Sequence, residues 1–125
     1  VLQACRDIGA AFVAFSPVAR GFLSDAPPDI TAFDAKDIRR SMPRFSPENY
    51  TKNQALLPAY NAIAAEVGCT PSQLAIAWCA SNPRVSTVIT GASTADQVRE
   101  NMGALDALAR LTPELKSELE SAVRR

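Results

Sequence analysis

The chain has 125 residues, of which 13 are Lys or Arg, 13 are Asp or Glu, three are Cys and none is His. Its net charge of zero gives no basic field for nucleic acid or an anionic membrane, and no apolar stretch reaches the roughly 20 residues of a membrane-spanning helix, so neither partner is expected. The cysteines lack CxxC spacing, which favours the reducing cytoplasm, and without His the commonest metal ligand and general base are missing, so no metal site is expected.

The first predicted elements are a helix and a buried strand. Residues 1–8 are typical of a helix that ends at Gly9. Because the sequence opens inside this helix, we expect an upstream portion and a larger domain. Residues 10–15 form a continuous apolar run, which predicts a parallel strand covered on both faces.

A long segment from residue 16 to residue 50 is proline-rich, polar and only weakly periodic. It predicts a long loop with one short helix around residues 34–40. Loops of this length in compact domains are usually functional or disordered. This one carries Arg20, Arg39, Arg40 and Arg44.

Two helices are predicted after the loop. Apolar residues at helical spacing predict a helix over residues 51–67, with Gly68 at its C-terminal cap. Thr70 as N-cap, Pro at the first helical position and Gln73 at the third predict a second helix, which ends before the Asn-Pro pair of residues 82–83.

A second strand and two more helices complete the order. Residues 85–90 are almost all β-branched, which predicts a strand. A capping pattern starts a helix at Thr94 that runs to about residue 102, and a last helix spans residues 112–125. Apolar strands alternating with helices predict a parallel α/β fold. Since two strands cannot form such a sheet alone, we expect partner strands in the upstream portion or in another chain.

The segment directly after the first strand is one candidate binding site, because α/β folds hold ligands at the carboxyl ends of their strands. Ser16 supplies a hydroxyl, Gly21 an accessible backbone and Arg20 a guanidinium. Together these groups can hold a phosphate diester. The alternative interpretation is a plain Ser-Pro turn that leaves a strand.

The segment after the second strand is another candidate. Gly91 allows a tight turn, and Ser93 stands near a helix start, where unpaired N–H groups and the dipole favour an anion. Gln97, Glu100 and Asn101 share one helical face and can converge on one ligand. In the alternative interpretation the helix is merely capped there and its polar face is solvated.

The remaining polar and aromatic residues receive structural interpretations. Trp78 is expected in the core. Asp25, Asp29 and Asp34 match no metal-binding loop and are expected to be solvated. Residues 70–84 could be interpreted as a DNA-binding helix-turn-helix, but the stretch is too apolar for a helix that reads a groove.

Taken together, these segments resemble the aldo-keto reductase superfamily, in the branch that includes the potassium-channel beta subunits and related bacterial reductases. Residues 16–21 are similar to the Ser-Pro-Leu-x-x-Gly loop of that family, residues 68–79 to its seventh-helix motif and residues 91–104 to its closing cofactor motif. Residues 38–45 are similar to the variable loop of the bacterial branch. The resemblance covers essentially the whole chain but only about the last third of the family's TIM-barrel fold.

The resemblance implies that residues 1–125 are the C-terminal part of a single barrel domain, a partial TIM (β/α)8 barrel with the last two strands, their helices and the C-terminal helix. It implies NADPH-dependent reduction of aldehydes and ketones to alcohols, with a small carbonyl compound as substrate. It also implies a set of cofactor-binding residues. They are Phe15 at the nicotinamide, Ser16, Pro17, Val18, Ala19 and Arg20 at the pyrophosphate and ribose, and Gly91, Ser93, Gln97, Glu100 and Asn101 at the adenosine end.

The sequence departs from the family pattern at the 2′-phosphate. Many members carry Lys near Gly91 and Arg at the position of Gln97, and this chain has neither, so NADH is not excluded as cofactor. Arg39, Arg40 or Arg44 of the long loop would substitute by folding over the cofactor.

The catalytic residues of the family are the second departure. Its catalytic Asp, Tyr, Lys and His belong to the first half of the barrel, and Tyr50 and Tyr60 stand in the wrong segments. No catalytic residue is therefore assigned, and the 125 residues alone are expected to be inactive. The alternative function is that of a cofactor-binding regulatory subunit, similar to the channel beta subunits, or of a catalytically inactive fragment.

Overall fold

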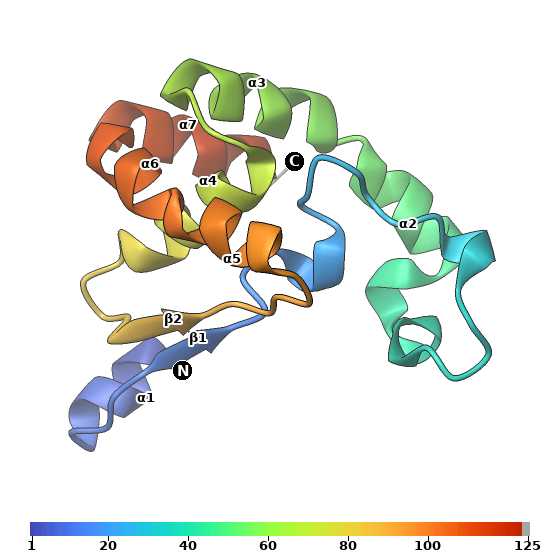
Figure 1. Ribbon diagram of the computed structural model, residues 1–125. Helices are drawn as coiled ribbons and strands as arrows, with labels where there is room; N and C mark the ends of the chain where they lie inside the picture. Colours follow the sequence, from blue (N-terminus) through green and yellow to red (C-terminus); the bar gives the residue numbers. More distant parts are fainter. Residues whose placement is uncertain (124–125) are drawn as a thin grey trace.

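Two short parallel strands lie along one side of a group of helices (Figure 1). The computed structural model describes residues 1–123, so the predicted last two helical residues, Arg124 and Arg125, lie outside the described residues. Strand β1 is Val13–Phe15 and strand β2 is Thr87–Ile89. The pair is parallel, as the sequence predicts, and Val13 is opposite Thr87 in its register.

The two strands are covered on one face only, so the prediction of a strand buried on both faces is wrong for the described residues. Ala14 points into the molecule and is 9% exposed, whereas Phe15 and Ile89 on the opposite face are 70% and 55% exposed. Helix α4 packs on the covered face. No element within residues 1–123 covers the other one.

The N-terminal helix α1 (Leu2–Asp7) lies beside the strands and buries none of its residues (Figure 1). Gly9 follows it with a positive φ of 68°, which glycine adopts without steric cost, so the predicted stop signal is confirmed. The strand begins four residues later. The turn between them brings the chain directly from the helix to the sheet.

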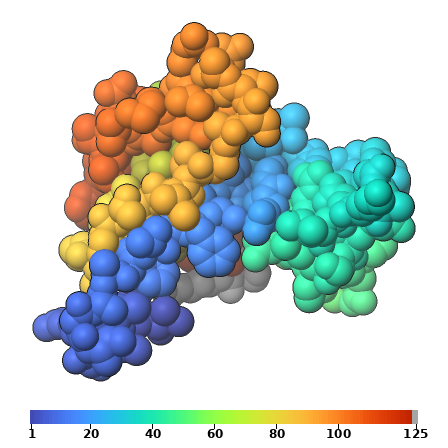
Figure 2. Space-filling model, turned by 60° about the horizontal axis from the view of Figure 1, so that its bottom comes forward, coloured from blue at the N-terminus to red at the C-terminus, as the bar shows by residue number. Residues whose placement is uncertain are grey.

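The segment between β1 and the main helices is more ordered than the predicted loop with one short helix. It contains four 3-10 helices: η1 (Ala19–Gly21), η2 (Ile30–Ala32), η3 (Ile38–Ser41) and η4 (Pro43–Phe45). Its aromatic side chains form a small core of their own. In Figure 2 the later part of this segment, coloured cyan, projects as part of a lobe to the right of the strands. The members of that aromatic core are Phe22, Phe33 and Phe45 of the segment and Tyr50 of the helix that follows it.

The predicted helix over residues 51–67 is in fact two helices, α2 (Pro47–Gln54) and α3 (Leu57–Val67). Pro58 is within the first two residues of α3, where its missing N–H is tolerated, but it cannot donate to a helix that continued from α2. The C-terminal cap at Gly68 is confirmed, since this residue has a left-handed φ of 74°.

Helix α4 (Pro71–Ala80) is the centre of the main core. Thr70 and Gln73 form the predicted capping box, and Leu74 is fully buried. Helices α5 (Ala95–Met102), α6 (Ala104–Arg110) and α7 (Pro113–Val123) follow β2, and α6 is an additional helix that the sequence analysis does not predict. Within residues 1–123, no helix has both the length and the apolar character needed to cross a bilayer.

Candidate functional site

A polar cavity of about 440 Å³ opens where the segments after β1 and β2 meet. Parallel strands direct their carboxyl ends to the same edge of the sheet, so the two loops converge there. The start of α4 and one residue of η3 complete the wall. The lining residues are Ser16, Pro17, Val18, Arg20, Gly21, Arg39, Ser72, Gly91, Ala92, Ser93, Gln97, Glu100 and Asn101.

Most residues of the two predicted segments line this one cavity, but two do not. Phe15 is exposed on the open face of the sheet, one position before the cavity begins. Ala19 packs instead against the aromatic cluster of the long segment. Ser72 also lines the cavity but is not among the predicted residues, although its place directly after the N-cap Thr70 and Pro71 of a helix is a signal for ligand-facing polar groups.

The loop after β1 has an unusual backbone. Ser16, Ala19 and Arg20 have positive φ values of 50°, 51° and 61°. This conformation is uncommon for residues other than glycine and concentrates at ligand-binding and catalytic sites. The Ala19 amide donates to the Ser16 carbonyl oxygen at 2.9 Å, and the Gly21 amide donates to that of Val18 at 3.0 Å. The loop is therefore a defined tight turn beside the cavity.

The loop before α5 is ordered by the side chains that follow it. The backbone amide of Gln97 donates to Thr94 Oγ1 at 3.2 Å, and this bond caps α5. The side-chain oxygen Oε1 of Gln97 accepts from the backbone amide of Ser93 at 2.6 Å. Asn101 Nδ2 donates to the Gly91 carbonyl oxygen at 3.4 Å. These bonds give the loop one shape before any ligand binds.

Glu100 is the acidic residue of the cavity wall, and α4 holds it in place. Thr70 Oγ1 donates to Glu100 Oε1 at 3.0 Å. Gln73 Nε2 donates to the Glu100 carbonyl oxygen at 2.8 Å. The side chain of Glu100 thus enters the cavity already restrained.

Arg39 reaches the cavity from the long segment, whereas Arg40 and Arg44 do not line it. Its guanidinium pairs with Asp37, with Nη2 and Oδ2 2.6 Å apart, and lies 4.2 Å from the ring centre of Phe33. The hydrogen bonds from Arg39 hold the pKa of Asp37 below its usual range. The guanidinium is thus fixed in direction before a ligand arrives.

The lining residues suit a ligand that carries both phosphate groups and an amino group that donates a hydrogen bond. Arg20 and Arg39 provide two guanidinium groups, and Ser16, Ser72 and Ser93 provide hydroxyls. Guanidinium and hydroxyl donors are the usual partners of phosphate oxygens. The Glu100 carboxylate can instead accept from an amino group.

The two tyrosines are structural. The Tyr50 hydroxyl donates to the Pro28 carbonyl oxygen and the Tyr60 hydroxyl donates to that of Pro71. Burial raises the pKa of Tyr60 far above its usual value. Neither tyrosine lines the polar cavity, so neither is placed to donate a proton to a ligand there.

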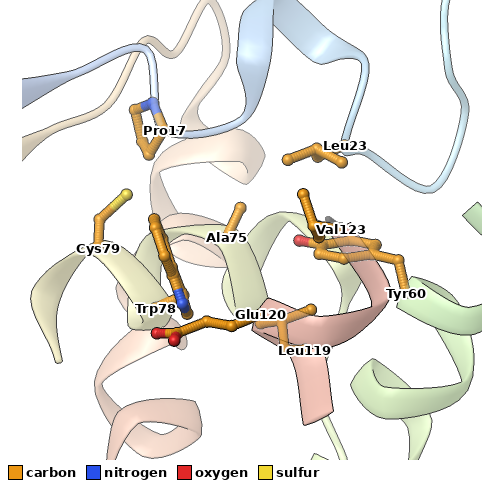
Figure 3. A pocket seen from close by; sticks show the side chains of 9 residues that line it. All are labelled: Pro17, Leu23, Tyr60, Ala75, Trp78, Cys79, Leu119, Glu120 and Val123. Atoms are coloured by element: carbon orange, nitrogen blue, oxygen red, sulfur yellow. The ribbon is translucent and has the colours of Figure 1, made fainter. Parts of the chain in front are cut away.

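A second cavity, of about 410 Å³, is apolar and lies on the other side of Pro17, between α4 and α7. Figure 3 shows Trp78 standing in this cavity with its ring opposite Leu23 and Val123 across the open space. Trp78 is 40% exposed, so the prediction that it lies in the core is wrong. Burial raises the pKa of the neighbouring Cys79 thiol, which keeps it in its poorly nucleophilic neutral form.

The loop aspartates and helix α4 have structural roles. Asp29 caps η2 by accepting from the Thr31 amide, and Asp34 accepts from that of Lys36. In residues 1–123, no group of three or more His, Cys, Asp or Glu side chains is arranged to hold a metal ion. Helix α4 is buried along most of its length, which prevents it from entering a DNA groove.

Comparisons with known proteins agree on one family. The sequence model of the Aldo/keto reductase family matches residues 1–124. A rice (Oryza sativa subsp. japonica) protein described as a probable voltage-gated potassium channel subunit beta is 41% identical over 124 residues, which cover 92% of this chain and 36% of the rice protein. The chain therefore spans only about a third of this relative's length.

Two solved structures share the fold. The glycerol dehydrogenase of Gluconobacter oxydans matches the whole chain over 37% of its own, with a TM-score of 0.80 and 22% identity. An aldo-keto reductase from Bacillus halodurans in its holo form matches 97% of the chain over 36% of its own, with a TM-score of 0.67 and 25% identity. In both, the match is confined to a limited part of a larger α/β protein.

Proposed function

The chain belongs to the aldo/keto reductase family, and we propose that it supplies the cofactor-binding part of an oxidoreductase that uses NADPH to reduce aldehydes or ketones to alcohols. The observation that carries the proposal is the single polar cavity to which both strand-end segments contribute. Its two guanidinium groups, its hydroxyls and its one carboxylate fit a dinucleotide that bears phosphates and an adenine amino group.

Each group has a role that follows from its place. Ser16, Arg20 and the tight turn around them would bind the pyrophosphate and ribose. Arg39 would neutralise the 2′-phosphate, and Glu100 would accept from the adenine amino group. When bound, the nicotinamide supplies hydride to the carbonyl carbon. Phe15, exposed at the end of β1, would contact the nicotinamide ring beyond the edge of the cavity.

The proposal assigns residues 1–125 to the C-terminal part of one TIM-barrel domain. Three features support it: parallel strands, an uncovered sheet face and the match to about a third of larger relatives. Strands and helices from the rest of the protein would cover Phe15 and Ile89 and close the sheet. They would also contribute the proton donor, since Tyr50 and Tyr60 are held in other places.

A small carbonyl compound is the proposed substrate, and the cytoplasm is the proposed location. The three cysteines at positions 5, 69 and 79 are all free thiols, which agrees with a reducing compartment.

The proposal is tested first by measuring NADPH binding and then by measuring the reduction of carbonyl compounds. The purified complete protein, with the rest of the barrel present, should quench or enhance NADPH fluorescence in a saturable way. A panel of aldehydes and ketones should then produce carbonyl-dependent loss of absorbance at 340 nm. Arg20→Ala should weaken NADPH binding, whereas Arg44→Ala, outside the cavity, should not. A protein that binds neither NADPH nor NADH contradicts the proposal.

A regulatory subunit is the second candidate function, favoured by the 41% identity to a protein described as a channel beta subunit. In that case the cofactor site would remain and the chief role would be the modulation of a partner protein. NADPH binding with no carbonyl-dependent oxidation over the whole panel would favour this candidate.

A further inference from the structure

The capping residue of α4 makes a second connection, to the cavity wall. Thr70 Oγ1 accepts from the backbone amide of Gln73 at 3.2 Å and donates to Glu100 Oε1 at 3.0 Å. A hydroxyl has one donor and two acceptor positions, so both bonds form at once. One side chain therefore caps α4 and restrains the carboxylate that α5 presents to the cavity.

Gln73 makes the matching connection to the main chain of Glu100. Its Oε1 accepts from the Thr70 amide at 3.1 Å, and its Nε2 donates to the Glu100 carbonyl oxygen at 2.8 Å. The two bonds fix which end of the side-chain amide faces which partner. Glu100 is thus held at both its side chain and its backbone by residues that are 30 and 27 positions away in the chain.

Gly103, directly after α5, leaves the space that this arrangement needs. A Cβ atom at this position would lie 2.3 Å from Gln73 Nε2 and 3.2 Å from the Glu100 carbonyl oxygen. The first of these distances is too short for any two heavy atoms that are not bonded. The contact between Gln73 and Glu100 therefore depends on the absence of a side chain at position 103.

We propose that Thr70, Gln73 and Gly103 form a clamp that positions Glu100 to accept a hydrogen bond from the adenine amino group of the cofactor. Thr70 donates to Oε1, which leaves Oε2 to accept the hydrogen bond from the ligand's amino group. The clamp residues do not touch the ligand and act through Glu100. This inference rests on the proposed function, because it takes an adenine dinucleotide as the occupant of the cavity.

The test separates the clamp from the helix cap. Asp caps a helix at least as well as Thr, but its carboxylate cannot donate to Glu100 and repels it. Thr70→Asp therefore keeps the cap and breaks the clamp, while Thr70→Ser keeps both. The dissociation constants of NADPH and of its analogue with hypoxanthine in place of adenine are measured for each variant without substrate. The analogue has a carbonyl where adenine has the amino group.

We expect Thr70→Asp to weaken NADPH binding roughly tenfold, which corresponds to about 1.4 kcal/mol, and to leave the affinity for the hypoxanthine analogue unchanged. Thr70→Ser should bind both ligands as the wild type does. The ratio of the two affinities is the decisive readout, because a loss of general stability would lower both.

The clamp is overturned if Thr70→Asp leaves the ratio of the NADPH and analogue affinities unchanged, whether neither affinity falls or both fall equally. If Thr70→Asp does not fold, Gln73→Glu takes its place with the same expectation, since Glu keeps the acceptor of the capping box and loses the donor to Glu100. A wild-type protein that binds neither NADPH nor NADH instead overturns the proposed function, and the clamp's role with it.

Discussion

Arg39 shows how a residue far from both strands becomes part of the cavity wall. Its guanidinium is fixed by three hydrogen bonds to the Asp37 carboxylate and by the ring of Phe33. A positive group that is already ordered binds a phosphate with less loss of side-chain entropy than a free one. Arg39 is therefore the residue on which the preference for a 2′-phosphate should depend.

Replacing Arg39 should change the choice between the two nicotinamide cofactors. We expect Arg39→Ala to lower the NADPH affinity about five- to tenfold and the NADH affinity less than twofold, because only NADPH carries the extra phosphate. Arg44→Ala is the matched control, since Arg44 is exposed and does not line the cavity. Equal affinity ratios in wild type and Arg39→Ala, from fluorescence titration, would remove Arg39 from this role.

Tyr60 makes stability sensitive to alkaline pH. Its burial keeps the pKa above the ordinary value of 10.0, so the folded chain holds the phenol neutral while the unfolded chain ionises. The stabilisation is complete below pH 10 and is lost as the pH rises above it.

The measurement for Tyr60 is the free energy of unfolding by urea between pH 9 and pH 12. Wild type should lose stability steeply above pH 10, and Tyr60→Phe should show a shallower slope, by at most about 1.4 kcal/mol per pH unit. Tyr60→Phe also loses the bond to Pro71 and should be less stable at neutral pH. Parallel slopes for the two proteins contradict the assignment.

At the scale of elements, helix α6 packs closely on α4 through a small residue. Ala107 is fully buried, whereas Ala109 on the same helix is exposed. Extra methyl groups in a close-packed core force side chains and backbone apart.

A pair of variants on α6 tests this packing. Ala107→Leu should destabilise the protein by about 1–3 kcal/mol, and Ala109→Leu should change its stability by less than about 0.5 kcal/mol. Both can be measured by chemical denaturation of the same preparation. A neutral Ala107→Leu would mean that α4 and α6 are less tightly packed than the burial of Ala107 indicates.

The elements also show what sequence patterns can predict. Caps are local, so the starts of α4 and α5 and the stop at Gly68 were predicted from a few adjacent residues. Helix α6 was missed because it is short and has no side-chain cap at its start. The exposure of Trp78 depends on which segments cover it, and no local pattern contains that information.

The parts of the cavity that depend on local sequence were predictable, and the parts that depend on the tertiary fold were not. Both strand-end segments were found because loops at the carboxyl ends of parallel strands converge. The approach of Arg39 and Ser72 to those loops depends on the tertiary fold of the long segment and on the start of α4. Ala19 was assigned to the cavity by motif, but its small side chain packs into the aromatic cluster instead.

At the scale of the whole molecule, the sheet exposes an apolar face. Phe15 and Ile89 are opposite each other in the strand register and are both more than half exposed. Apolar side chains gathered on a sheet with open edges favour association with other protein surfaces.

The 125-residue chain on its own should therefore self-associate as its concentration rises. Sedimentation velocity should show a growing fraction of larger species, and Ile89→Thr should reduce that fraction. Ile38→Thr is the matched control, because Ile38 is 57% exposed but lies in η3, away from the sheet. A chain that stays monomeric at high concentration would show that this face does not drive association.

The register of the two strands has a consequence for biosynthesis. Val13 pairs with Thr87, so the partner of β1 is translated 74 positions later. At 5–20 residues per second, the first strand leaves the ribosome roughly 4 to 15 seconds before the second one does. The aromatic cluster and helices α2 to α4 are complete in that interval, whereas the edge of β1 that pairs with β2 stays open. Nascent-chain chaperones should bind this strand during the delay, and slower translation of residues 16–86 should lengthen their stay.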